Sequence, residues 1–165
     1  MSNNLETYSC LLMDSPVGPI KLSSQNEKLI ALEFLAEEDE NICTTKISSC
    51  LKQTALELEE YFAGKRQTFT TELEPIGTAF QKNAWKELQN IPYGHTISYS
   101  EQAEKIGGKQ YCRAVGQANK RNPIPIIIPC HRVIGKSGKL TGYASGLSRK
   151  QKLLDWETKN SFSKQ

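Results

Sequence analysis

A run of isoleucines bracketed by prolines constrains the fold of this chain more than any other part of its sequence. The segment Asn122–Pro129 reads NPIPIIIP. An unbroken apolar run predicts burial, but Pro125 supplies no backbone N–H to a β ladder, which argues against a central strand. The sequence therefore predicts a stiff, buried approach to the next residue, Cys130.

Cys130 and His131 together form a candidate nucleophile and base. A thiol with a pKa of about 8.5 is mostly protonated at neutral pH and attacks carbon only as the thiolate. His131 can take the proton if a third group holds its tautomer, and Glu157 in the last predicted helix is the best-placed acid, with Asp155 as its rival. Neighbours in an extended chain point to opposite faces, so the pair needs a turn or a water between them. The alternative is that Cys130 is a small buried hydrophobe and His131 a satisfied polar residue.

The charge of the chain is divided unevenly between its halves. Residues 1–77 hold 6 Lys and Arg against 13 Asp and Glu, a net charge of −7, whereas residues 78–165 hold 15 against 5, a net charge of +10. A basic half beside an acidic half favours a polyanionic partner for the basic one, such as a nucleic acid. The alternative is a solvated surface with scattered cations.

Residues 1–76 predict a small α/β support domain. Strand-like runs cover residues 8–13, 20–23 and 29–35, and helical spacing extends from Ile47 to Gly64. Residues 69–73 are a candidate for a further strand, and Glu37–Glu40 is expected to be a solvated loop. The fold class expected here is a small antiparallel sheet with one helix.

Residues 77–165 predict a mainly α-helical domain with a helix-turn-helix. A helix is expected over residues 78–89, followed by two short helices around Gly107-Gly108. Ser98 with Glu101 three residues later predicts the capping box of the first short helix. Two short helices joined by a glycine-containing turn are the outline of a helix-turn-helix.

The second short helix, about residues 111–120, is suited to a nucleic-acid groove. It carries Arg113 near its start and Lys120 and Arg121 at its end, with small residues such as Ala114 and Gly116 between. Small side chains allow a close approach to a groove, and flanking cations can meet phosphates. The alternative is a tight contact between helices.

Several motifs in order resemble the methylated-DNA–protein-cysteine methyltransferases, also called O6-alkylguanine-DNA alkyltransferases. The resemblance covers Gly77–Glu157, about half of the chain. The motifs are Gly77-Thr78-x-Phe80-Gln81-x-x-x-Trp85, Ile91-Pro92-Tyr93-Gly94-x-Thr96-x-Ser98-Tyr99, Arg113-Ala114-Val115-Gly116, Asn122-Pro123-Ile124-Pro125, Pro129-Cys130-His131-Arg132-Val133 and the Gly142-Tyr143 loop.

The resemblance implies the chemistry of the site. Cys130 would accept a methyl or alkyl group from O6 of guanine in duplex DNA, and possible activity on O4 of thymine is left open. His131 would activate Cys130 through a bridging water, with Glu157 holding the histidine. Tyr99 would assist the departure of guanine, and Asn122 would tie the recognition helix to the cysteine segment. No group is expected to cleave the resulting thioether, so each molecule would act once.

The resemblance also implies how DNA is held. Binding in the minor groove would be followed by base flipping, with Arg113 filling the gap left by the extruded nucleotide. The other DNA-binding residues would be Tyr99, Ala114, Gly116, Lys120 and Arg121, and the pocket for the flipped base would comprise Pro125, Val133, Tyr143, Ala144 and Ser145. The first 76 residues would correspond to the family's ribonuclease H-like domain.

The five cysteines form no Cys-x-x-Cys pair, and their odd number favours a reducing compartment, so we expect a cytoplasmic protein. Cys10, Cys43 and Cys50 are widely spaced and expected to be buried, and no metal site is expected because His95 lies in a turn. No cofactor, membrane span or obligate protein partner is expected. The predicted partner is double-stranded DNA containing O6-alkylguanine, bound by a monomer.

Two departures from the family pattern and two rival functions remain at this point. Cys112 stands before Arg113 where the family commonly has a smaller residue, and the Ala144-Ser145-Gly146 loop replaces a usual glycine pair, which bears on the width of the pocket. A DNA-binding module without transfer would lack the cysteine at position 130. A thiol hydrolase would turn over a soluble acyl substrate without DNA.

Overall fold

The computed structural model describes residues 7–36, 43 and 46–161. The chain divides into two compact units, Met1–Pro75 and Ile76–Gln165. The expected fold class is confirmed, because the first unit holds a three-stranded antiparallel sheet with a helix and the second is mainly helical. The predicted loop Glu37–Glu40 lies outside the described residues.

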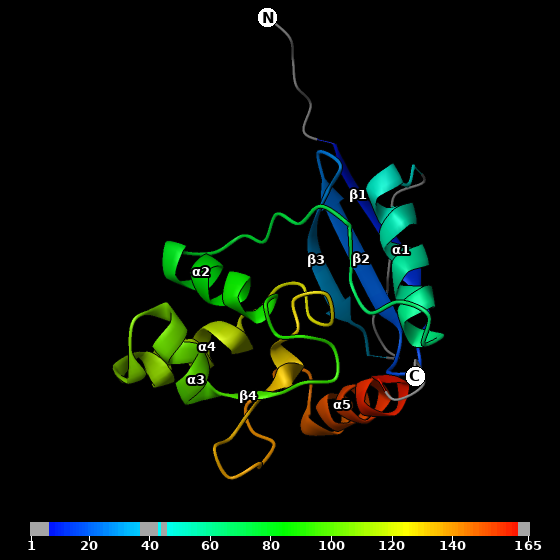
Figure 1. The fold of residues 1–165 in the computed structure, drawn as a ribbon. Helices are drawn as coiled ribbons and strands as arrows, with labels where there is room; N and C mark the ends of the chain where they lie inside the picture. Colours follow the sequence, from blue (N-terminus) through cyan, green and yellow to red (C-terminus); the bar gives the residue numbers. More distant parts are fainter. Residues whose placement is uncertain (1–6, 37–42, 44–45, 162–165) are drawn as a thin grey trace, which may run out of the picture. The chain divides into compact units, whose positions relative to one another are not determined.

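The sheet of the first unit is a meander of β1 (Tyr8–Met13), β2 (Ile20–Gln25) and β3 (Lys28–Phe34). Asn26 and Glu27 join β2 to β3 with φ of 50° and 60°. Positive φ at both central residues is what a two-residue hairpin needs to match the twist of its strands. The helix α1 (Ser49–Phe62) lies along one face of this sheet (Figure 1) and contacts all three strands.

A buried carboxylate on α1 explains why residues 69–73 do not form the candidate strand. Glu57 is buried and accepts the backbone N–H groups of Thr70 and Thr71, at 2.9 and 3.3 Å. These donors are then lost to a β ladder, and only an isolated bridge between Leu29 and Leu73 remains. The prediction of a further strand is therefore wrong.

The cysteine count favoured a reducing compartment with buried cysteines, but two of the cysteines are paired and Cys43 is only half-buried. Cys10 on β1 forms a disulfide with Cys43, whose Cα atom lies 5.3 Å from that of Cys10, within the usual reach of such a bond. Cys50, Cys112 and Cys130 are free, so the residue at the end of the proline-rich segment keeps its thiol.

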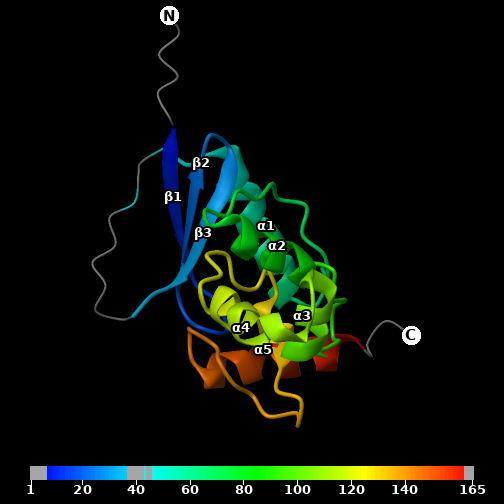
Figure 2. The same ribbon diagram turned by 90° about the vertical axis from the view of Figure 1, so that its left-hand side faces the viewer.

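The second unit is built around three packed helices and a longer C-terminal one. Thr78 and Ser98 each begin a helix with a complete capping box, a feature that stabilises a helix by about 1 kcal/mol. The helices are α2 (Ala79–Leu88), α3 (Tyr99–Ile106), α4 (Cys112–Lys120) and α5 (Leu147–Ser161), with a 3₁₀ turn η1 (Lys109–Tyr111) before α4. The first three helices of this unit, α2, α3 and α4, contact one another and lie side by side in Figures 1 and 2.

Buried polar groups fix the position of α4. The indole Nε1 of Trp85 on α2 donates to the carbonyl of Ala118 at 2.8 Å. The buried amides of Gln102 on α3 and Asn119 on α4 exchange two hydrogen bonds, at 3.1 and 2.7 Å. Because buried polar groups require such partners, these bonds specify one orientation of α4 against α2 and α3.

A short parallel pairing brings the start of α3 to the cysteine segment. β4 (Ile97–Ser98) pairs with β5 (Val133–Ile134), and a 3₁₀ turn η2 (Cys130–Arg132) directly precedes β5. Tyr99 follows β4, so this pairing sets it near the cysteine turn. Among the described residues, no helix is long and apolar enough to cross a membrane.

Candidate functional site

Asn122 holds the proline-rich segment that leads to the cysteine. Its Oδ1 accepts the N–H of Ile124 at 3.0 Å, and its Nδ2 donates to the carbonyl of Ile128 at 2.8 Å. The segment is buried and consists of turns, with Ile126 at a φ of 74°. A β-branched residue rarely adopts this left-handed conformation, so the surrounding structure must impose it. Cys130 therefore follows a stretch of fixed geometry.

Cys130 is a free, buried thiol. The residue is 6% exposed. Cys130 is the first residue of η2, so the turn that the sequence analysis required between Cys130 and His131 is present. Burial raises the pKa of the Cys130 thiol to about 11, although an interaction with Asn122 and the charge of Lys150 act in the opposite direction. At neutral pH the resting sulfur is therefore protonated, and its reaction requires a proton acceptor.

His131 is placed to be that acceptor. Its Nε2 lies 2.7 Å from Oε1 of Glu157, and both side chains are almost fully buried. Burial lowers the pKa of His131 despite the opposing hydrogen bond to Glu157, so the imidazole is neutral at pH 7. Nε2 then carries the hydrogen shared with the carboxylate, which leaves Nδ1 as the basic nitrogen. Nδ1 has no hydrogen-bond partner in the part of the chain that the structure describes.

Glu157 is the centre of a buried ionic cluster. Arg132 donates from Nε to Oε2 at 2.8 Å and from Nη2 to Oε1 at 2.9 Å, and the N–H of Gly94 reaches Oε2 at 3.2 Å. Burial alone would raise the pKa of Glu157, but the hydrogen bonds from His131 and Arg132 and the positive charge of Arg132 hold it well below its usual range. The rival acid Asp155 is exposed on the same helix and accepts from Gln151 at 2.7 Å.

Lys150 is a buried cation that the sequence reasoning missed. It is 0% exposed, and its Nζ donates to the carbonyls of Val133 at 2.6 Å and Thr141 at 2.9 Å. Lys150, Leu153 and Glu157 share one face of α5 at spacings of three and four residues, and all three are buried. This helical spacing could have indicated that Lys150 is buried, but a lysine in a helix is usually assigned to the solvent-exposed surface.

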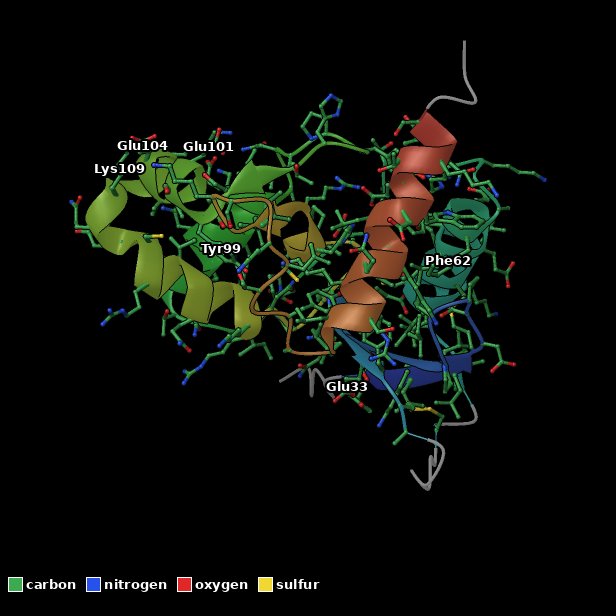
Figure 3. The ribbon with its side chains drawn as sticks, turned by 90° about the horizontal axis from the view of Figure 1, so that it is seen from below. Glu33, Phe62, Tyr99, Glu101, Glu104 and Lys109 are labelled. Atoms are coloured by element: carbon green, nitrogen blue, oxygen red, sulfur yellow. A yellow bond between two sulfur atoms is a disulfide. The ribbon has the colours of Figure 1, made fainter. Side chains whose placement is uncertain are left out.

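Tyr99 and Lys150 meet at one backbone carbonyl. Tyr99 Oη donates to Thr141 O at 2.9 Å, and the Lys150 ammonium lies 5.8 Å from the centre of the Tyr99 ring. Figure 3 shows Tyr99 beside the segment that precedes α5. A Cβ on Gly142, which has a φ of 65°, would lie 3.1 Å from this hydroxyl, so glycine suits the close approach.

The sequence-predicted pocket residues differ in exposure. Pro125 and Val133 are buried, and Tyr143 is 9% exposed, whereas Ser145 is half-buried and Ala144 is exposed. Arg149 Nη1 donates to the carbonyl of Ser145 at 2.6 Å, which pins the loop to the first turn of α5.

Of the predicted DNA-binding residues, Arg113 and Ala114 lie on the outer side of α4 and Lys120 and Arg121 lie at its end. Val115, Ala118 and Asn119 face inward, and Gly116 lies under the ring of Tyr99. The exposed residues are Arg113, Ala114, Lys120 and Arg121. The outward position of Ala114 leaves that side of the helix open to approach.

The turn between α3 and α4 is closed by an ion pair, in which Lys109 of η1 lies 3.1 Å from Glu104 of α3 (Figure 3).

Within residues 7–36, 43 and 46–161, no group of three His, Cys, Asp or Glu side chains could hold a metal ion. His95 Nδ1 instead lies 3.1 Å from the carbonyl of Tyr93.

Comparisons with known proteins agree over both units. The chain matches the ribonuclease-like domain of 6-O-methylguanine DNA methyltransferase at residues 8–75 and the DNA binding domain of that protein at residues 79–159. A methylated-DNA–protein-cysteine methyltransferase of Methanosarcina barkeri is 49% identical over 152 residues, which cover 90% of this chain and 96% of the relative. The chain belongs to the 6-O-methylguanine DNA methyltransferase family.

Solved structures of this family share the fold. The crystal structure of Mycobacterium tuberculosis O6-methylguanine methyltransferase superposes with a TM-score of 0.84 at 43% identity, covering 93% of this chain and 94% of that one. The structure of Mycobacterium tuberculosis OGT in complex with DNA superposes with a TM-score of 0.82 at 45% identity, covering 90% and 92% of the two chains.

Proposed function

We propose that this protein repairs DNA by direct reversal, moving a methyl or larger alkyl group from O6 of guanine in duplex DNA to Cys130. The observation that carries the proposal is a free thiol on a rigid segment, followed by a neutral histidine whose Nε2 is committed to Glu157. Relatives named for methyl transfer from DNA to a protein cysteine, and a similar structure in complex with DNA, support the substrate.

The proton of Cys130 passes to Nδ1 of His131 through a bridging water. The sulfur then attacks the alkyl carbon, the S–C bond forms as the C–O6 bond breaks, and the electron pair remains on guanine. Guanine anion is a poor leaving group, so a proton or hydrogen bond from Tyr99 assists its departure. Tyr99 donates to Thr141 in this structure, and we infer that the base competes for this donor. Asn122 maintains the position of the sulfur.

The target carbon is unreachable inside a duplex, so its nucleotide must be extruded at a cost of a few kcal/mol. In this proposal α4 enters the minor groove, Arg113 occupies the gap, and Lys120 and Arg121 meet phosphates, as their exposure allows. Main-chain groups around Val133 and residues 143–145 hold the flipped base. O4-alkylthymine is a second candidate substrate of the same pocket.

The protein acts once, as a monomer and without a cofactor. One chain supplies each group in the proposed mechanism, and a thioether at Cys130 is chemically stable in the absence of a second nucleophile. The reaction consumes the free thiol of Cys130, which the disulfide between Cys10 and Cys43 does not involve, so we place the protein in the cytoplasm, with no obligate protein partner.

Intact-protein and peptide mass spectrometry test the function. Incubation with duplex DNA containing O6-methylguanine should add one methyl mass to the peptide bearing Cys130, and no more with excess substrate. Cys130→Ala should abolish transfer and still bind the duplex. Methylation of Cys112 instead, or repeated turnover, would refute the assignment. Turnover of an acyl ester without DNA would favour a thiol hydrolase.

A further inference from the structure

The hydroxyl groups of Tyr99 and Tyr143, both in the second unit, differ in whether they have a hydrogen-bond partner. Tyr99 Oη is committed to the carbonyl of Thr141. Tyr143 Oη is sealed from solvent and has no hydrogen-bond partner among the residues that the structure describes. A buried donor without a partner costs free energy, and in native proteins such a group usually meets a ligand or an ordered water.

The loop that carries Tyr143 is held at both ends. Gly142 takes a φ of 65°, the N–H of Gly146 donates to the carbonyl of Tyr143 at 3.1 Å, and Arg149 is bonded to Ser145. These contacts oppose rotation of the loop that would carry the hydroxyl out to water. The hydroxyl therefore stays in the interior as an available donor.

Tyr143 keeps its proton, and so remains a hydrogen-bond donor, at neutral pH. Burial raises the pKa of Tyr143 well above that of a free phenol, and the neighbouring Cys130 raises it further. Lys150 Nζ donates to the carbonyls of both Val133 and Thr141, which holds the segment before Tyr143 beside the segment that follows Cys130. An alkyl group attacked by Cys130 must lie against its sulfur, so its outer atoms enter the same buried region.

We propose that the Tyr143 hydroxyl determines alkyl specificity by donating a hydrogen bond to adducts that carry an oxygen on their second carbon, such as the 2-hydroxyethyl group. The inference rests on the proposed function and names a substrate class for it. Transfer forms a bond between Sγ and the first carbon and breaks the bond from that carbon to O6. Guanine keeps the electron pair and takes up a proton, and the oxygen on the second carbon is unchanged.

The test compares two adducts of nearly equal reach on the same duplex, O6-(2-hydroxyethyl)guanine and O6-propylguanine. Single-turnover rates are measured for the wild type and for Tyr143→Phe, which keeps the ring and removes only the donor. The ratio of the hydroxyethyl rate to the propyl rate should fall about tenfold in the variant, since one hydrogen bond is worth about that factor. A ratio within about twofold of the wild-type value would overturn the proposal.

Two further measurements keep the result interpretable. If Tyr143→Phe does not fold, the wild-type hydroxyethyl rate is compared with the propyl rate after both are divided by the rates of attack by a free thiol on the same duplexes. A corrected preference of about tenfold for hydroxyethyl supports the proposal, and no preference overturns it. Transfer from O6-methylguanine to Cys130 is recorded in parallel, because its absence would indicate failure of the proposed function itself.

Discussion

Replacing Glu157 by glutamine removes the charge on which the site is organised. The carboxylate accepts from His131, twice from Arg132 and once from the backbone of Gly94. Glu157 is 1% exposed and Arg132 is buried, so solvent does little to screen the pair. Glu157→Gln keeps the shape of the side chain but leaves a buried guanidinium without its counter-charge.

The loss of stability in Glu157→Gln follows from the burial of the ion pair between Glu157 and Arg132. Removing one partner of a buried ion pair destabilises a protein by about 3–5 kcal/mol. For a chain of this size that corresponds to a fall of about 6–20 °C in Tm. The variant should also transfer alkyl groups about a hundredfold more slowly, because a neutral amide no longer fixes the hydrogen on Nε2 and leaves Nδ1 of His131 free as the base.

Urea unfolding at several pH values and single-turnover transfer measure the two effects. The folded pKa of Glu157 lies below its unfolded value of about 4.3, so its stabilisation is complete above that pH and is lost as the pH falls toward the folded value. The difference in unfolding free energy between wild type and Glu157→Gln should therefore be full at pH 7 and shrink below about pH 4.

Asp155→Asn is the matched control, since it makes the same change on an exposed turn of α5. It should alter stability by less than about 0.5 kcal/mol. The reasoning fails if Glu157→Gln unfolds and reacts like the wild type, or if Asp155→Asn has the larger effect.

Two further variants test the surface and the buried cation. Arg113→Ala should slow repair of duplex DNA far more than reaction with free O6-benzylguanine, because only the duplex requires a gap to be filled; equal losses in the two rates would exclude that role. Lys150→Met should lower the free energy of unfolding by about 2–4 kcal/mol, since the carbonyls of Val133 and Thr141 lose a buried donor. An unchanged urea midpoint would show that these acceptors find other partners.

The features that local physics determines could be predicted from the sequence. Ser98 with Glu101 marked the start of α3, and Gly107 its end, because caps depend on residues a few positions apart. The prolines around the isoleucine run excluded a central strand for the same reason.

Features that depend on distant segments could not be predicted in this way. Residues 69–73 have strand character, but Glu57 from α1 takes the donors of Thr70 and Thr71. The bond between Cys10 and Cys43 likewise joins positions 33 residues apart, and no local pattern distinguishes them from Cys50. Local sequence therefore predicted a strand for residues 69–73 and free thiols for Cys10 and Cys43, which are the usual states of such residues.

The buried charges around Cys130 show why sequence reasoning underestimates such a site. Arg132 and Lys150 bring two positive charges into the interior, and Glu157 supplies one negative charge. Burying a cation costs desolvation free energy, which the bonds from Lys150 to two carbonyls offset here, and a lysine within a helix is therefore normally assigned to the surface. The excess of positive charge favours a thiolate over a thiol, and the charge of Lys150 does act to lower the pKa of Cys130 against the effect of burial. The arrangement is thus less favourable while the sulfur is protonated and becomes more favourable as negative charge develops on it, which is the property that transfer to a buried cysteine requires.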